Sequence, residues 1–484
     1  MAQNIALSDN IEEYLLDAFG KDFLENYRNY IQSDANTYIR ISTADGNDEA
    51  IVESLKQYGI ELEALPNIPF GYRVLNGFEY IGKTLEFTLG KYYIQSLSSM
   101  IPPLILQPDS EDTVLDLCAA PGSKSSQLAE MMENKGTLYV NEPNINRIKS
   151  LVFNFDKMNF VNFGAIKYKG ELLSKVFENT FDKILVDAPC SGLGILQKKG
   201  EVSNWWSLQQ AEKIAELQFR LLLSALKMLK PGGEMIYSTC TLTVEENEVT
   251  LNKILRKYPV EIKEIELPVK SHPAFTSYNG EELNPEIAKA HRIIPWEVNS
   301  EGFFICKLRK TGETEPTRKA DYKKRNIELL SAKSKDMKKY LEQISSYFGI
   351  PLEILQGFKY IRKGNDFNFV DKDWYSDNYD LFLRIGRKFG LVDKRDYAHL
   401  NSYAIQVLAP YITKNIIELD NPDDLRKYID GGIIKKQFEP YGQKIVKYNN
   451  LFFGTAIAFK DGLKSQFPRA LRTSEIITPE EANK

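Results

Sequence analysis

The sequence predicts an α/β protein with a Rossmann-like central domain, a small N-terminal domain and a β-rich C-terminal domain. Strand-like and helix-like segments alternate from Thr113 to Leu308, which is the pattern of a parallel sheet covered on both faces. The run from Phe181 to Asp187 contains a continuous apolar stretch, as expected of a strand buried on both faces. After Asp366, aromatic β-type runs separated by Gly-Gly and Asp-Gly turns replace this alternation.

The segments of the central domain, residues 86–310, can be placed from their patterns. Strands are expected at 113–117, 136–141, 164–168, 181–187, 234–238 and 302–309, and helices at 124–134, 144–158 and 208–229. Pro231-Gly232-Gly233 ends the last of these helices. Before the first strand we expect one helix over 87–106, which begins near Gly90 and stops at Pro102-Pro103.

The flanking domains show weaker patterns. The N-terminal domain, residues 1–85, is expected to be an RNA-binding lead-in domain, and apolar positions at helical spacing predict a helix over 8–32 with Ser8 as N-cap. A strand is expected at 38–42, and a second helix at 49–58 ends at Gly59. The later segments are expected to be a basic linker and helical and β connector at 311–384, with a helix over 341–358, and a separate β-rich domain at 385–484.

The composition excludes some classes of function. The 484 residues include 62 basic and 66 acidic side chains, so any polyanion site must be a local patch. The three histidines lie outside the motifs described below, so neither histidine acid–base chemistry nor a metal site is expected. Four cysteines in separate contexts, without a signal-peptide pattern or a membrane-length apolar run, favour a reducing cytoplasm.

The first strand of the central domain leads into a turn of small residues, Cys118-Ala119-Ala120-Pro121-Gly122-Ser123-Lys124. This turn lacks the spacing of a dinucleotide loop or of a phosphate loop, but it allows a ligand to approach the backbone closely. Glu142 ends the second strand, where an acid can bind ribose hydroxyls, although alone it fits equally well as an acid at a helix N-terminus. Together these features suit S-adenosylmethionine, which has a ribose but no phosphate.

Two cysteines follow the ends of two other strands, in Asp187-Ala188-Pro189-Cys190 and in Ser238-Thr239-Cys240. A lone cysteine is most often a small buried hydrophobe, and we expect Cys118 and Cys306 to be of that kind. Cys190 and Cys240 differ because turn-forming residues surround them. Since the carboxyl ends of strands meet at one edge of a parallel sheet, we expect both thiols and the cofactor turn in one crevice.

This combination suits methyl transfer to C5 of a pyrimidine. C5 is a poor nucleophile, and addition of a thiolate at C6 converts the ring into an enamine-like nucleophile that accepts the methyl group. The thiolate needs an electropositive setting, which Lys124 and the sulfonium of the cofactor can supply. Asp187 is placed to protonate or hydrogen-bond N3 of the ring as charge develops.

These residues resemble the RNA cytosine-5 methyltransferases of the Nol/Nop/Sun type, over about Gly90 to Arg309. The resemblance rests on Tyr93-Ile94-Gln95 with Ser98-Ser99-Met100, the Cys118 to Lys124 turn, Asp187-Ala188-Pro189-Cys190-Ser191-Gly192, Pro231-Gly232-Gly233, and Tyr237-Ser238-Thr239-Cys240-Thr241 with Glu245-Glu246-Asn247. The long C-terminal region makes the chain most similar to the bacterial RsmF-like branch, which acts on small-subunit ribosomal RNA. That region resembles the PUA-like RNA-binding module of the branch near 420–432 and 462–472.

The resemblance implies a cytoplasmic, monomeric enzyme that uses S-adenosyl-L-methionine and binds RNA, with no membrane partner. It implies that Cys240 is the nucleophile, that Cys190 assists product release, and that Asp187 and Lys124 act beside them. The cofactor and base pocket is implied to include Cys118, Ala119, Ala120, Pro121, Gly122, Ser123, Lys124, Glu142 and Asp187. DNA cytosine methyltransferases use the thiol of the Pro-Cys motif instead, and the Thr-Cys partner favours the RNA order.

One position departs from the family pattern. The family usually has an acid after the third strand, near the adenine of the cofactor, and this chain has Lys169 there. Glu171 or a backbone group would then have to bind the adenine. The affinity for the cofactor is the property that this departure affects.

RNA contacts are expected from local patches. The basic candidates are the cluster from Arg318 to Arg325, Lys435-Lys436, Lys464, Arg469 and Arg472, and the cluster fits a solvated helix as well as an RNA contact. The aromatic candidates for stacking, most of them expected in the core, are Trp205, Trp206, Tyr428, Phe438 and Phe467. The alternatives are a transfer RNA methyltransferase, a DNA cytosine methyltransferase and a non-catalytic RNA-binding assembly factor. The intact pair of thiols disfavours the last of these.

Overall fold

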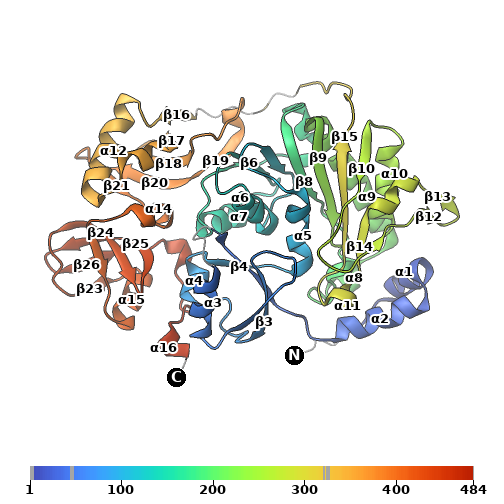
Figure 1. Ribbon diagram of the computed structural model, residues 1–484, viewed down its shortest axis with the longest axis horizontal. Helices are drawn as coiled ribbons and strands as arrows, with labels where there is room; N and C mark the ends of the chain where they lie inside the picture. The colour runs from blue at the N-terminus through green and yellow to red at the C-terminus, as the bar shows by residue number, and fades with distance from the viewer. Residues whose placement is uncertain (1–4, 44–47, 320–321, 323–326, 483–484) are drawn as a thin grey trace.

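The computed structural model of the protein describes residues 5–43, 48–319, 322 and 327–482, and its described part is built around one large mixed sheet (Figure 1). The expected basic positions Lys323, Lys324 and Arg325 lie outside the described residues. Five neighbouring strands of the sheet are parallel and confirm the predicted series: β5 (Thr113–Asp116), β6 (Thr137–Asn141), β7 (Phe163–Ile166), β8 (Phe181–Asp187) and β9 (Leu229–Thr239).

Antiparallel strands extend this parallel core at both edges. Beyond β9 lie β15 (Phe303–Lys310), β14 (His291–Ile293) and β11 (His272–Pro273), with β10 (Val260–Lys263) also paired to β15. Beyond β7 lies β19 (Phe382–Ile385), which comes from the segment expected to be a connector. Among the described residues the sheet therefore has ten strands, in the order β11-β14-β15-β9-β8-β5-β6-β7-β19 with β10 beside β15.

Helices cover both faces of the sheet, as the alternating pattern predicts. On one face, α9 (Leu208–Met228) and α10 (Thr250–Leu255) pack on residues such as Leu115, Ile184 and Tyr237. On the other, α5 (Leu97–Leu106), α6 (Ser123–Met131) and α7 (Ile145–Lys157) pack on Val114, Leu185 and their neighbours. Successive strand residues thus enter two different cores, since side chains alternate across a strand.

The single helix expected over 87–106 is wrong. The chain instead forms α4 (Leu85–Thr88), β4 (Tyr92–Ile94) and then α5. Gly90 adopts a φ of 74°, and a Cβ at this position would overlap the carbonyl oxygen of Lys157. Glycine is therefore required where the chain turns out of α4, and the helix cannot continue through it.

The expected stop at Pro102-Pro103 is also wrong, because α5 runs through both prolines to Leu106. Pro103 has no N–H to donate to the carbonyl of Ser99, which a helix would otherwise pair with it. The side-chain amide of Gln95 donates to that oxygen instead, at 3.0 Å. A neighbouring strand end thus supplies the hydrogen bond that the helix lacks.

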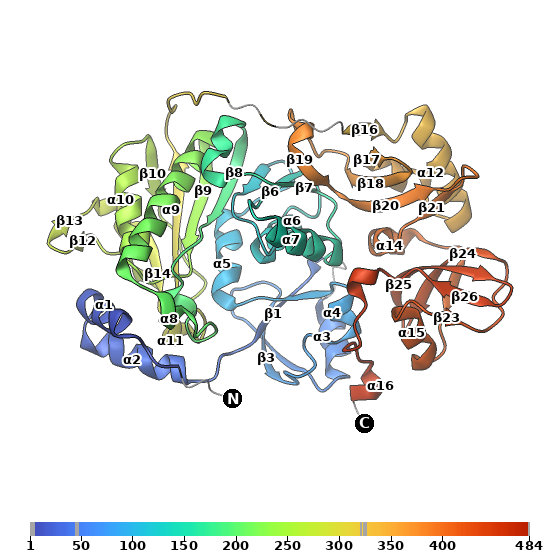
Figure 2. The ribbon, with the colours of Figure 1, turned by 180° about the vertical axis from the view of Figure 1, so that it is seen from behind.

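The helix expected over 8–32 is broken at Gly20, with a φ of 85°, into α1 (Asp9–Phe19) and α2 (Lys21–Gln32). Ser8 is at the N-cap position but makes no side-chain cap hydrogen bond. The α1–α2 hairpin packs beside the strand ends at α8 (Val202–Trp205) and α11 (Pro295–Val298), as both views show (Figures 1 and 2).

The rest of the N-terminal segment lies apart from the hairpin, beneath the middle of the molecule (Figure 1). The predicted strand and second helix are confirmed as β1 (Tyr38–Ile41) and α3 (Asp48–Lys56). The small sheet has the order β2-β3-β1-β4, with β2 at Glu61–Ala64 and β3 at Gly71–Asn76. The N-terminal residues therefore form two separate packing units.

Two further sheets, each of five strands within the described residues, lie at the other side of the central sheet (Figure 1). The first contains β16 (Glu328–Ser331), β17 (Phe358–Lys363), β18 (Asp366–Asp371), β20 (Arg387–Val392) and β21 (Ala398–Leu400). The second contains β22 (Ile416–Glu418), β24 (Gly442–Tyr448), β25 (Leu451–Phe459), β26 (Gly462–Ser465) and β23 (Ile433–Ile434). Because β20 pairs with β18, residues on both sides of position 385 share one sheet.

The helix expected over 341–358 begins earlier and is interrupted. It forms α12 (Lys335–Phe348) and α13 (Leu352–Gln356), separated at Gly349 and Pro351. Throughout the part of the chain that the structure describes, no helix is both long enough and apolar enough to cross a membrane.

Candidate active site

The strand order reverses between β5 and β8, which places a crevice at their carboxyl ends. β6 and β7 follow β5 on one side, and β8 and β9 extend the sheet on the other. A cavity of about 360 Å³ opens there, and its lining includes Cys118, Glu142, Asp187, Cys190 and Cys240. The sheet topology thus joins the expected cofactor turn and both thiols of the two cysteine motifs.

The two thiols are in contact. The Sγ atoms of Cys190 and Cys240 lie 3.0 Å apart, and each side chain is only partly buried. The hydrogen bond with Cys240, together with burial, raises the pKa of Cys190 well above its usual value. Cys190 therefore keeps its proton near neutral pH and is the natural donor to the sulfur of Cys240.

A partly buried ion pair stands beside the thiols. Lys124 Nζ, at the start of α6, lies 2.7 Å from Asp187 Oδ2, and Ser238 Oγ donates to Asp187 Oδ1 at 2.8 Å. Burial lowers the pKa of Lys124, but the charge and the hydrogen bond of Asp187 outweigh burial, so the pKa is raised. Lys124 is therefore a fixed positive charge, which favours a thiolate nearby.

The side chain of Asp116 holds the cofactor turn. The buried carboxylate of Asp116 accepts from the N–H of Cys118 at 3.2 Å and from Ser125 Oγ at 2.6 Å. Burial raises the pKa of Asp116 to about 7 and raises that of the Cys118 thiol. Of the turn, Cys118 and Ala120 line the cavity, and the expected residues that do not are Ala119, Pro121, Gly122, Ser123 and Lys124.

Gly122 faces α7 and does not line the cavity. It caps α6 with a φ of 113°, and a Cβ there would lie 3.1 Å from the side chain of Leu151 on α7. The glycine therefore permits close packing of the turn on α7, which in turn holds the cavity-lining residues in place.

Glu142 directly follows β6 and is buried at the cavity wall. Its carboxylate accepts from the N–H of Asn144 at 2.8 Å and lies 3.1 Å from a guanidinium nitrogen of Arg147. Arg147 also donates to the carbonyl of Ala120 at 2.6 Å, so it connects the acid to the cofactor turn. Sequence reasoning missed Arg147, although its place in the first turn of α7, directly after an acidic strand end, was a usable signal.

The position that departs from the family pattern lies outside the cavity lining. Lys169 is exposed, whereas Gly170 and Glu171 line the cavity. Glu171 thus supplies an acid at this wall, two positions after the position where the family has one. Glu142 can accept from the hydroxyls of a ribose, and the turn of small residues lets a ligand approach the backbone. With these features the lining fits an adenosine-type cofactor.

Cys306 lies in β15, fully buried in the core, and burial raises the pKa of its thiol. It lies outside the cavity lining, as expected. Among the aromatic candidates, Trp206, Tyr428 and Phe467 are buried, Phe438 is partly buried, and Trp205 is 43% exposed. The expectation that most of them are core residues is confirmed.

Comparison with known proteins gives the family. Residues 103–309 match the family described as 16S rRNA methyltransferase RsmB/F. The ribosomal RNA small subunit methyltransferase F of Shewanella woodyi is 31% identical over 468 residues, which is 94% of this chain and 94% of that protein. The chain belongs to the RsmB/F family.

Two further matches each cover 62% of this chain. The tRNA (cytosine(49)-C(5))-methyltransferase of Pyrococcus abyssi is 34% identical over 302 residues, 62% of this chain and 96% of that protein. A crystal structure of a methyltransferase homologue from Pyrococcus horikoshii matches with a TM-score of 0.56 and 31% identity, over 62% of this chain and 93% of that chain.

As an RsmB/F enzyme, the protein is an S-adenosylmethionine-dependent RNA cytosine-5 methyltransferase. The expected family, enzyme class and cofactor are confirmed. The family acts on RNA, so the alternative of a DNA cytosine methyltransferase loses its support.

Proposed function

We propose that the protein methylates C5 of a cytosine in small-subunit ribosomal RNA, through a covalent bond between Cys240 and C6 of the base. The observation that carries this proposal is the contact of the two sulfurs, 3.0 Å apart, beside the cavity that fits the cofactor. S-adenosylmethionine, when bound there, supplies the methyl group as an electrophile.

The first step is addition of Cys240. Its thiolate forms the S–C6 bond, and the electrons of the C5=C6 double bond become available at C5 for the methyl group. Asp187 stands at the same strand end, and a proton passed to it from Lys124 Nζ, 2.7 Å from Oδ2, lets its carboxyl group donate to N3 as negative charge develops there. Lys124 and Ser238 hold the carboxylate of Asp187 from two sides, at 2.7 and 2.8 Å, which fixes its direction.

The second step is release, in which Cys190 acts. A base takes the proton from C5, the C5=C6 bond forms again, and the S–C6 bond breaks to return Cys240 as a thiolate. The hydrogen bond and the charge of Cys240 both raise the pKa of Cys190 in the free enzyme. Once Cys240 is bonded to carbon, both influences disappear, while burial still raises the pKa. Cys190, which is partly exposed, then gives its proton to water, and its thiolate takes the C5 proton.

Ribosomal RNA is the preferred substrate class because the similarity to ribosomal RNA small subunit methyltransferase F extends over 94% of the chain. We propose that the C-terminal sheet β22–β26 is the PUA-like RNA-binding module. Lys464 and Arg469 are exposed there, and Ile433 pairs with Lys464, so that Lys435 lies near the same edge. Arg472 instead donates to the carbonyl of Phe467 at 2.8 Å.

Transfer RNA is the second candidate substrate, because the chain is 34% identical to the Pyrococcus abyssi transfer RNA enzyme over 302 residues. The test is transfer of a labelled methyl group to small ribosomal subunits, to naked 16S ribosomal RNA and to transfer RNA. The proposal predicts label in 5-methylcytosine of ribosomal RNA with the wild-type enzyme and none with Cys240→Ala. Label in transfer RNA alone, or label with Cys240→Ala, would contradict it.

A further inference from the structure

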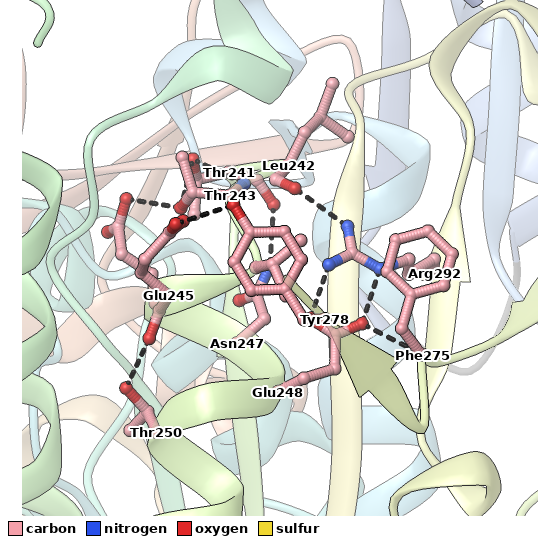
Figure 3. A network of polar contacts seen from close by, with 12 residues as sticks. Thr241, Leu242, Thr243, Glu245, Asn247, Glu248, Thr250, Phe275, Tyr278 and Arg292 are labelled. Atoms are coloured by element: carbon pink, nitrogen blue, oxygen red, sulfur yellow. Dashed lines mark hydrogen bonds and ion pairs between the residues drawn. The ribbon is translucent and has the colours of Figure 1, made fainter. Parts of the chain in front are cut away.

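A single π-helical turn, Glu245–Val249, follows the Cys240 loop and contacts the surrounding segments. Four consecutive side chains of the turn each bind a different neighbouring segment. Figure 3 shows Glu245 near Tyr278, Asn247 beneath the Thr241 backbone, and Glu248 facing Arg292. Such turns recur at functional sites because they aim several neighbouring side chains in unusual directions.

Glu246 is the member of this turn that connects the two cysteine loops. Its carboxylate is fully buried and accepts three hydrogen bonds. Oε2 accepts from the N–H of Ser191 at 3.0 Å and from Gln218 Nε2 at 2.8 Å, and Oε1 accepts from Thr243 Oγ1 at 2.7 Å. Ser191 follows Cys190 directly, so this carboxylate is bonded to the residue next to that thiol.

Glu246 contacts the Cys190 loop on both sides of the cysteine, in addition to the direct contacts of Ser191 and Gly194 with the Cys240 loop. On one side, Ser191 donates to Glu246 directly. On the other, Gln218 donates both to the carbonyl of Pro189, at 2.8 Å, and to Glu246. Loss of the carboxylate would therefore free two of the contacts that fix the backbone around Cys190.

The Cys240 loop has supports of its own. Asn247 accepts from Thr239 Oγ1 at 2.7 Å and donates to the carbonyl of Thr241 at 3.2 Å. Arg292, paired with the buried Glu248, donates to the carbonyl of Leu242 at 2.8 Å, as Figure 3 shows. Cys240 therefore remains held when Glu246 is changed.

From this asymmetry we propose that Glu246 is a positioning residue that holds Cys190 beside Cys240, and that it acts on product release more than on adduct formation. The proposal rests on the function proposed above, in which Cys240 adds to the base and Cys190 completes release. It assigns Glu246 no contact with the RNA or the cofactor.

The length and shape of the Glu246 side chain, more than its charge, set the distance between the sulfurs of Cys190 and Cys240. Glutamine keeps the length: its oxygen can face Ser191 and Gln218, and its NH₂ can donate to the hydroxyl of Thr243, which also accepts. Aspartate keeps the charge but is one methylene shorter, so one carboxylate can no longer reach both loops. Glu246→Gln and Glu246→Asp therefore separate geometry from charge.

The first test measures the two sulfurs without RNA. Oxidation with the diazenedicarboxamide diamide removes two hydrogens from the dithiol, forms the S–S bond and reduces the N=N bond of the reagent to a hydrazine. Peptide mapping should detect the Cys190–Cys240 disulfide rapidly in the wild type and in Glu246→Gln. Glu246→Asp should form it about 100-fold more slowly, the scale expected for a misplacement of about 1 Å.

The second test follows one turnover with RNA. Glu246→Asp should form the covalent protein–RNA species at close to the wild-type rate and then accumulate it, with release slowed about 100-fold. Glu246→Gln should release product like the wild type. The matched control is Glu245→Gln, in the same turn, whose carboxylate binds the hydroxyls of Tyr14 and Tyr278, and it should accumulate no adduct.

The outcomes separate this inference from the proposed function. If Glu246→Asp releases product and forms the disulfide at wild-type rates, or if it forms no adduct at all while Cys190→Ala does, the role of Glu246 is overturned and the function stands. If Glu246→Asp is more active than Glu246→Gln, charge and not spacing matters, and the inference also fails. If even Cys190→Ala forms no adduct, the proposed function itself fails.

Discussion

Gly194 shows at the residue scale how closely the two cysteine loops approach. Its N–H donates to the carbonyl of Cys240 at 3.0 Å, and its own carbonyl accepts from the N–H of Gly302 at 2.9 Å. A Cβ at position 194 would overlap the oxygen of Gly302 and lie 2.8 Å from that of Cys240. These atoms are backbone, so the loops would have to separate.

We therefore predict that Gly194→Ala lowers kcat about 100-fold, the scale of a misplacement of about 1 Å between reacting groups. Cofactor affinity, measured by calorimetry, should change little because Gly194 does not line the cavity. Gly82→Ala is the control, since a Cβ there meets only the end of Ile94 at 4.0 Å. Full activity of Gly194→Ala would show that the loops tolerate separation.

Lys157 is a buried cation that pairs with no carboxylate among the described residues, and its Nζ lies 3.0 Å from the centre of the Phe87 ring. Burial lowers its pKa from 10.5 to about 7. Between these pH values the unfolded chain binds more protons than the native state, so stability rises with pH across that window. Below pH 7 the full cost of burying the charge is present.

Lys157→Met removes this cost, part of which the ring of Phe87 offsets. It should raise the free energy of unfolding by about 2 kcal/mol at pH 6, and by less as the pH rises toward 10. Thermal melting of both proteins at pH 6 and pH 9.5 measures the difference. An equal gain at both pH values would mean that Lys157 is not neutralised in the folded protein.

The sequence predicts the two thiols at this scale because each follows a strand end, and parallel strand ends share one edge. It does not predict the role of Glu246, whose partners Ser191 and Gln218 lie 55 and 28 positions away along the chain. A buried acid that binds loops so distant carries no local pattern. The sequence shows only that three acidic residues, Glu245, Glu246 and Glu248, follow the Thr-Cys motif closely.

At the scale of elements, α5 shows why proline patterns can mislead. Pro103 leaves the carbonyl of Ser99 without its helical donor, and Gln95 supplies one at 3.0 Å from the end of β4. A local rule therefore predicts a stop at the prolines, and a tertiary contact removes its cause. The apolar helix is buried on all sides, which adds stability that the local rule does not count.

This account predicts a coupled pair of substitutions. Gln95→Ala should lower the free energy of unfolding by about 1–3 kcal/mol, because a buried carbonyl loses its partner. In a Pro103→Ala background the loss should be smaller, since the substituted alanine brings an N–H that can bond to the carbonyl of Ser99. Denaturation of the four proteins of this cycle gives the coupling. Additive effects would show that Gln95 does not replace the missing helical bond.

On the scale of the whole molecule, the C-terminal sheets lie on the far side of the central sheet from the α1–α2 hairpin (Figures 1 and 2). The exposed charges of the hairpin are mostly acidic, whereas Lys464 on β26 and Arg469, just after that strand, are exposed. RNA is therefore expected to extend from the cysteines toward the C-terminal sheets and not across the hairpin.

We predict that Lys464→Ala and Arg469→Ala each weaken RNA binding and lower the slope of log K against log salt by about 1. The control is Lys21→Ala on α2, whose side chain is 79% exposed among acidic neighbours. Affinities measured at several salt concentrations give the slopes. If Lys21→Ala changes the slope and the other two do not, the RNA path runs over the hairpin.

The layout of the molecule was predictable where contacts are local. The predicted strands and helices of residues 113–309 follow from the periodicity within each segment, which is a local property of the sequence. The pairing of β19 with β7 joins Phe382 to Ile166, more than two hundred positions apart, and no pattern in a four-residue strand indicates it. Gly20 likewise fits within a long helix by its sequence pattern, but in the structure the helix breaks there into α1 and α2.

The central claim is that the sulfur of Cys240 bonds to the base and that of Cys190 completes release. The most direct measurement is the mass of the species formed by Cys190→Ala with RNA and S-adenosylmethionine under denaturing conditions. The account predicts a stable covalent protein–RNA adduct, mapped by peptide sequencing to Cys240. An adduct mapped to Cys190 in Cys240→Ala, with none in Cys190→Ala, would contradict it.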